Sequence, residues 1–168
     1  MALPTKPIPP DPQSIYQHAY SFLFANHRLV NTEPHYPHFE AIPSLVIIAF
    51  ANEILFKCIH AMDKSNPDLT DTHRLDILFK RLSNARKKQI IKLWDGSPNQ
   101  KAIENFNKQS GSTAPTDLPG ILLDCGDAFV KLRYFYERPG GSSQLLGTLP
   151  DILNKVILET HPEWEIRL

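Results

Sequence analysis

The sequence has few of the residues that mark a secreted, disulfide-bonded or membrane-anchored protein. Its 168 residues include two cysteines, Cys58 and Cys125, whose spacing fits neither a disulfide framework nor a zinc knuckle. The longest unbroken apolar run, Leu45 to Ala51, has seven residues, whereas a membrane span needs about 20. The N-terminus lacks the charged start and apolar core of a signal peptide. We therefore expect a soluble cytoplasmic protein that does not associate with a membrane.

Net charge is also lacking, since Lys and Arg together number 18 and so do Asp and Glu. This balance argues against a protein that coats nucleic acid or an anionic membrane through bulk charge. A local basic patch is still present, because the run from Arg81 to Lys92 holds five cations and no acidic residue. Such a run would suit RNA phosphates, although solvated helix faces have the same composition.

Glycine is scarce, with seven residues, whereas proline is abundant, with 15. The prolines stand between stretches whose apolar residues recur at helical spacing, and no stretch shows the sustained alternation of a strand. The pattern predicts an all-α fold, an antiparallel bundle of four to five main helices with a short C-terminal helix. We expect residues 1–12 to form a proline-rich tail and residues 13–168 to form a single domain.

The helix expected over 44–64 is apolar nearly all round, which predicts a place at the centre of the bundle. Its main polar residues form one narrow stripe of Glu53, Lys57, His60 and Lys64. The other expected helices cover 13–30, a stretch capped by Asp71 or Thr72, 81–94, 99–108, 118–137 and 149–160, with a loop over 31–42.

The most unusual charge is Arg133, because its helical neighbours include Phe129 and Tyr136. An arginine in such surroundings is seldom buried unless it is paired. Glu137 is the nearest candidate partner along the helix, and Glu53 is a candidate across the bundle. The residues fit either a guanidinium held by a carboxylate to bind a phosphate, or a structural ion pair.

His73 is a second candidate, as a general acid or base or as a side chain that covers a helix start. The other histidines bring no recognisable ligand motif, so no metal site is expected. The sequence also lacks a phosphate loop, a glycine-rich nucleotide fingerprint and a serine-nucleophile elbow. We therefore expect no cofactor.

Three segments together resemble the HEPN superfamily. The segment ANEILFK at 51–57 resembles its Ala-x-Glu-x-x-x-Lys helix. The segment THRLDILF at 72–79 is similar to its Gly-His-Asp-Leu-x-x-Leu-Phe pattern, from which Thr72 and Arg74 depart. The segment FVKLRYFYE at 129–137 resembles its Phe-x-x-x-Arg-Tyr-x-Tyr-Glu helix.

The resemblance implies a small antiparallel helical bundle that commonly dimerises. Many members are metal-independent ribonucleases of toxin–antitoxin and defence systems, with an arginine followed four to six residues later by a histidine. Arg133 matches the arginine, but Arg138, Pro139 and Gly140 stand where the histidine would be. Arginine cannot shuttle protons near neutral pH, so the missing histidine removes the usual acid or base.

We therefore expect a non-catalytic HEPN-like module that binds RNA or a nucleotide, or regulates a partner, as a homodimer in toxin–antitoxin, defence or RNA-processing systems. Its polar cluster would comprise Glu53, Lys57, His73, Asp76, Arg133 and Glu137.

Two alternatives stay open, so the sequence does not decide whether the chain is an enzyme. One is an active ribonuclease with an atypical site of Arg133 and His73. The other is a purely structural protein–protein interaction module, in which the proline-rich tail docks a protein partner.

Overall fold

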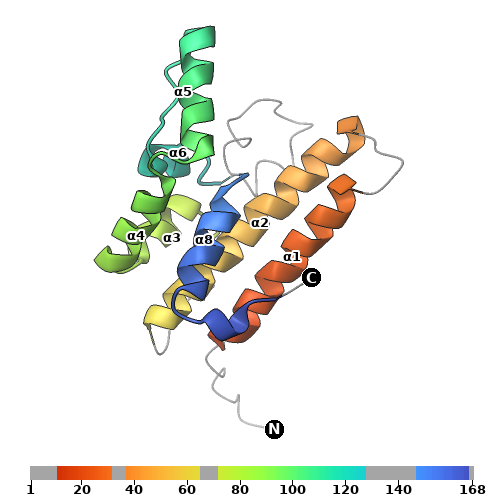
Figure 1. Ribbon diagram of the computed structural model, residues 1–168, viewed down its shortest axis with the longest axis vertical. Helices are drawn as coiled ribbons and strands as arrows, with labels where there is room; N and C mark the ends of the chain where they lie inside the picture. The colour runs from red at the N-terminus through yellow and green to blue at the C-terminus, as the bar shows by residue number, and fades with distance from the viewer. Residues whose placement is uncertain (1–10, 32–36, 65–71, 128–146, 167–168) are drawn as a thin grey trace, which may run out of the picture.

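The computed structural model describes residues 11–31, 37–64, 72–127 and 147–166, and these residues form an all-α bundle without strands (Figure 1). Two long helices, α1 (Pro12–Asn31) and α2 (Pro37–Asp63), run antiparallel along each other. The helix α8 (Leu149–Leu158) packs on α2 and leads into a single 3-10 turn, η2 (Pro162–Trp164). The all-α prediction is confirmed.

The remaining helices are shorter and follow one another between α2 and α8. They are α3 (Leu75–Arg81), α4 (Asn84–Trp94), α5 (Pro98–Ser110) and α6 (Leu118–Asp124). α3 packs on α2 and α6, and α4 packs on α8. α5 projects from the body of the molecule (Figure 1), and its one buried residue is Ile103.

The central place of α2 is confirmed by its burial. Every residue from Ala51 to Ala61 except Lys57 is buried, which includes both apolar faces and the polar Glu53. Among the described residues, one stretch of α2, Ala41–Asp63, is long and apolar enough to cross a membrane by length and composition alone. Half of its apolar window is buried inside the protein, so it is weak evidence for a span.

The start of α2 corrects the loop expected over 31–42. The helix begins at Pro37, and Pro43 lies inside it. A proline is tolerated in the first turn, because its missing N–H has no helical partner there. Pro43 is exposed, and it removes one main-chain hydrogen bond from the helix.

The helix expected over 118–137 is also corrected, because α6 ends at Asp124 and residues 125–127 form a turn. Gly126 has low helix propensity. Its carbonyl oxygen accepts a hydrogen bond from the N–H of Leu75 at 2.9 Å, so it is directed at α3. A contact between distant segments thus ends the helix.

The third predicted start is wrong in detail, since α3 begins at Leu75 and its N-cap residue, Arg74, makes no side-chain cap. Asp71 lies outside the described residues, and the hydroxyl of Thr72 accepts a hydrogen bond from the N–H of Arg74 at 3.1 Å. The predictions for α1, α5 and α8 agree with the structure to within two residues at each end.

The two tryptophans lie in different surroundings. Trp94 closes α4, is fully buried and donates from its indole N–H to the carbonyl of Thr116 at 3.0 Å. Trp164 is half-buried in η2, stacks on the ring of His161 with centroids 4.0 Å apart and packs beside Tyr16 of α1. The hydroxyl of Tyr16 in turn donates to Asn154 of α8 at 2.8 Å.

Candidate functional site

The predicted polar stripe of α2 centres on Glu53, a carboxylate that is 1% exposed. Its Oε1 accepts a hydrogen bond from the Nζ of Lys57, one turn along the helix, at 2.7 Å. The same oxygen lies 2.9 Å from Nδ1 of His73, just before α3. The structure therefore brings together three of the six residues predicted for the polar cluster.

The three side chains differ in their access to solvent. The side chain of Glu53 is 2% exposed, that of Lys57 15% and that of His73 55%. Burial of a carboxylate is costly unless it is paired and hydrogen-bonded. The Oε2 atom of Glu53 is buried and has no hydrogen-bond partner within the part of the chain that the structure describes. Glu53 thus acts as an inner anchor that fixes an ammonium and an imidazole at the edge of the bundle.

Asp76, the fourth predicted residue, anchors a separate pair of cations in the first turn of α3. It is 5% exposed, and its two oxygens accept hydrogen bonds from Nε of Arg74 at 3.0 Å and Nζ of Lys80 at 3.2 Å. Burial acts to raise the pKa of Asp76, but the hydrogen bonds from Arg74 and Lys80 outweigh it and the pKa lies below its ordinary value. The hydrogen bond to Asp76 also raises the pKa of Arg74.

A glycine lies directly against this second anchor. A Cβ added at Gly126 would lie 2.7 Å from Oδ1 of Asp76 and 3.4 Å from Nη2 of Arg74. Real Cβ atoms do not approach other atoms as closely as 2.7 Å. The turn after α6 and the start of α3 therefore meet without a side chain between them, as the Gly126–Leu75 main-chain bond also shows.

The other two predicted cluster residues, Arg133 and Glu137, lie outside the described residues. The alternative ribonuclease site needs Arg133 beside His73, so it also includes a residue outside the described ranges. Sequence reasoning missed Arg74, which counted only as a departure from a family pattern. The contact of Asp76 with Lys80 carries a readable signal, because the two residues are four apart on one helix. The contact with Arg74, two residues before Asp76, follows no such rule.

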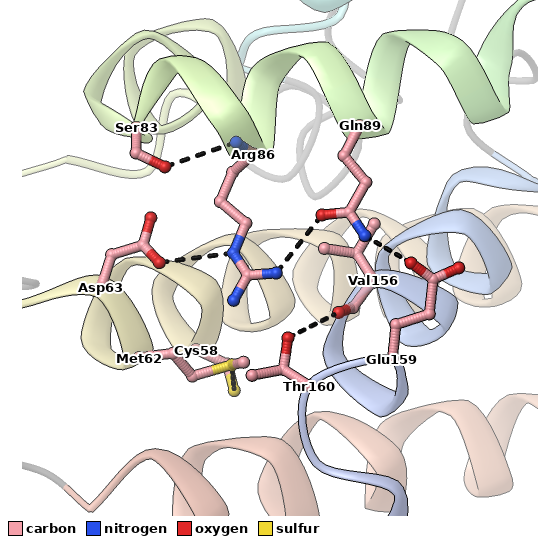
Figure 2. Close-up of polar contacts among 9 residues, drawn as sticks. All are labelled: Cys58, Met62, Asp63, Ser83, Arg86, Gln89, Val156, Glu159 and Thr160. Carbon is pink, nitrogen blue, oxygen red and sulfur yellow. Dashed lines mark hydrogen bonds and ion pairs between the residues drawn. The ribbon is translucent and has the colours of Figure 1, made fainter.

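The basic run from Arg81 to Lys92 is partly structural (Figure 2). The side chain of Arg86 is 16% exposed, and its Nε donates to Oδ1 of Asp63 at the end of α2 at 3.3 Å. Its Nη1 donates to Gln89 at 3.3 Å, and Gln89 donates to Glu159 just after α8. Arg86 therefore links α4 to α2, and through Gln89 to the end of α8.

The other lysines of the run face outward to different degrees. Lys88 and Lys92 are exposed, and Lys87 is half-buried. The Nζ of Lys87 lies 3.5 Å from the carbonyl oxygen of Lys80, which places its charge beside the end of α3. The Asp76 anchor and the first turn of α4 thus contribute cations to neighbouring parts of the surface.

Comparisons with protein-family models, with curated proteins and with solved structures found no match to this chain.

Proposed function

We propose that the chain is a HEPN-like binding module that holds RNA or a nucleotide without cleaving it. One observation carries the proposal: two buried carboxylates, Glu53 of α2 and Asp76 of α3, hold four cationic or protonatable side chains. In this proposal the protein works as a cytoplasmic homodimer in a toxin–antitoxin, defence or RNA-processing system, and these bound side chains face the ligand.

The two carboxylates and the cations that they hold differ in their exposure to solvent. Both carboxylates face inward and are almost inaccessible, whereas His73 is 55% exposed, Arg74 46% and Lys80 69%. A ligand therefore meets cations first, and these cations are already oriented by their partners. Arginine and lysine arranged in this way are the common donors to phosphate oxygens.

The HEPN resemblance is supported by one contact. The segments 51–57 and 72–79, two of the three that resemble the superfamily, are joined by the bond between Glu53 and His73. If both segments belong to one conserved site of the superfamily, their polar side chains are expected to contact each other in the fold. The third segment lies outside the described residues.

The direct test is the binding of a fluorescein-labelled single-stranded RNA of mixed sequence, followed by fluorescence anisotropy at low salt. We expect Lys57→Gln and His73→Gln each to weaken binding by about tenfold, or about 1.4 kcal/mol. Lys92→Gln on the exposed face of α4 is the matched control and should change Kd little. If the folded wild-type protein bound neither RNA nor mononucleotides, the proposal would be wrong.

A second candidate function is metal-independent RNA cleavage, and the 2.9 Å contact between Glu53 and His73 favours it. A buried carboxylate that orients an imidazole is the usual support of a general acid or base. In this mechanism His73 would take the proton of the 2′-hydroxyl, whose oxygen attacks the phosphorus and displaces the 5′-oxygen. The leaving 5′-oxygen would take a proton from solvent water, and Arg133 would stabilise the charge on the phosphorus centre. Cleavage of RNA by the wild type in EDTA, lost in both His73→Ala and Arg133→Ala, would establish it and replace the binding proposal.

A further inference from the structure

We propose that Arg74 and Lys80, built on the carboxylate of Asp76, form a phosphate-binding subsite of their own. The subsite rests on the proposed function and deepens it, because it assigns the group that the module recognises. Its ligand is the phosphate group of a nucleotide or of RNA.

Arg74 is bound to the protein through one side of its guanidinium group, the Nε. Its Nε donates to the Oδ1 of Asp76 at 3.0 Å, whereas Nη1 and Nη2 make no hydrogen bond with the residues that the structure describes. The side chain is 46% exposed. A guanidinium fixed through Nε keeps its plane and presents its two terminal N–H₂ groups as a fork, and this fork matches two oxygens of a phosphate.

Lys80 supplies the second cation from the other oxygen of the same carboxylate. Its Nζ donates to the Oδ2 of Asp76 at 3.2 Å, and its side chain is 69% exposed. An ammonium has three donors, so this contact leaves two for a ligand. Because one buried carboxylate holds both nitrogens, the two cations stay close enough for a single phosphate to contact both. Their orientation is established before the ligand arrives, which reduces the entropy lost on binding.

Gly126 keeps the subsite in this arrangement, and we infer that it is a positioning residue. Any side chain there would overlap the Oδ1 of Asp76, the atom that holds Arg74. The absence of a Cβ therefore lets the turn after α6 close against Asp76 without displacing the guanidinium.

The charges around the subsite set its strength. Asp127 adds a negative charge that acts on Arg74, and it opposes the approach of an anion. Lys87, whose Nζ lies 3.5 Å from the carbonyl of Lys80, acts in the other direction. We therefore expect weak binding of inorganic phosphate alone and stronger binding when the rest of a nucleotide or RNA contributes.

The first experiment uses inorganic phosphate as the probe and the Nε–H resonance of Arg74 in nuclear magnetic resonance as the readout. Phosphate should shift that resonance in the wild-type protein in a saturable way. Lys80→Gln should weaken the response by about fivefold, and Lys88→Gln should leave it unchanged. Arg74→Lys, which keeps the charge and loses the fork, should weaken the binding of AMP by about fivefold. A phosphate response that is absent in the wild type, or equal in Lys80→Gln, would overturn the subsite.

The second experiment separates the two sources of the phosphate. Tighter binding of AMP than of adenosine, lost in Arg74→Gln, would assign a free nucleotide. Equal binding of 5′-phosphorylated and 5′-hydroxyl RNA, both weakened about tenfold in Arg74→Gln, would assign the RNA backbone. RNA binding and AMP binding that are both the same in the wild type and in Arg74→Gln would overturn the subsite and leave the proposed function standing. A phosphate response that is weakened in Lys80→Gln, in a protein that binds neither RNA nor nucleotides, would overturn the proposed function and leave an anion site at Arg74 and Lys80.

Discussion

Two arginines of this chain, Arg74 and Arg86, make similar contacts with opposite consequences. Each donates from Nε to an aspartate, at 3.0 Å to Asp76 and at 3.3 Å to Asp63. Arg86 is 16% exposed, and its Nη1 donates to the half-buried Gln89 where α4 meets the ends of α2 and α8 (Figure 2). Arg74 is 46% exposed, and its two terminal nitrogens make no hydrogen bond with the residues that the structure describes.

Both arginines therefore bind an aspartate, yet their roles differ. The role of each arginine depends on whether its remaining N–H donors bind the protein or stay without a partner among the described residues. In the Arg86 pair the carboxylate is 20% exposed and both partners face a junction of helices. In the Arg74 pair the carboxylate is 5% exposed and the cation lies outside it. The first arrangement joins helices, and the second presents a charge.

The substitution expected to have the largest effect on the Arg74 pair is Gly126→Ala. The new Cβ must move Asp76, the start of α3 or the turn after α6, and such overpacking costs about 1–3 kcal/mol. We expect a lower Tm together with a loss of phosphate binding of tenfold or more. Gly147→Ala is the matched control, because its Cβ would meet nothing within 4 Å. A Gly126→Ala protein with wild-type Tm and phosphate affinity would contradict the close approach.

The next largest effect is expected for Arg86→Ala. It leaves Asp63 and Gln89 without a partner they now share, which should cost about 1–2 kcal/mol, and the Tm should fall by several degrees. Arg74→Ala should change stability by less than about 0.5 kcal/mol, because the pair is exposed on its cationic side. In thermal unfolding Arg86→Ala should therefore lower the Tm more than Arg74→Ala does. In phosphate titration Arg74→Ala should weaken binding more than Arg86→Ala does. Equal rankings in the two measurements would remove the distinction between the two arginines.

A smaller effect should appear at acid pH. The pKa of Asp76 is lowered by Arg74 and Lys80 in spite of burial, so its carboxylate stabilises the fold above the unfolded value of about 3.9. That contribution is lost as the pH falls through the lower folded value. Denaturant unfolding at pH 6 and pH 3 should show a smaller pH-dependent loss for Asp76→Asn than for the wild type. An identical loss in the two proteins would show that Asp76 is not held by its cations.

The smallest effect is expected for Asp127→Asn, which removes an opposing charge near Arg74. A single partly screened surface charge is worth about 0.2–1 kcal/mol, so phosphate should bind about two- to threefold more tightly. The gain should shrink at high salt, because salt screens exposed charges. Weaker binding in this variant would mean that Asp127 supports the subsite instead of opposing it.

Much of the fold could be predicted from local signals. The helical spacing of apolar residues placed α1, α5 and α8 within two residues, and the all-round apolar pattern of α2 identified the central helix. The two large errors concern the start of α2 and the end of α6. The end of α6 depends on a contact between distant segments. No periodicity shows that the carbonyl of Gly126 turns toward Leu75.

The candidate site divides in the same way. Glu53 and Lys57 are four residues apart on one helix, so their contact could be predicted from the stripe they share. The sequence placed Glu53 and His73 in one polar cluster but did not pair them, because the partner considered for Glu53 was Arg133. The bond that joins Glu53 and His73 is a contact between α2 and the residues before α3. The role proposed for Arg74 depends on the close approach of Gly126 to Asp76 in the folded protein. No local sequence pattern predicts this approach, because the two residues are far apart in the chain.

The placement of the two tryptophans gives the protein a pair of internal optical reporters. Trp94 sits in the apolar interior and is tied to Thr116, so its emission should be blue-shifted and follow the docking of α4 against the segment before α6. Trp164 is half-buried against His161, so its emission should lie further to the red and follow the packing of η2 on α1. Because the chain has two tryptophans, Trp164→Phe leaves a single emitter. Trp94 then reports alone on the docking of α4 as the protein unfolds, and Trp94→Phe would report in the same way on the packing of η2.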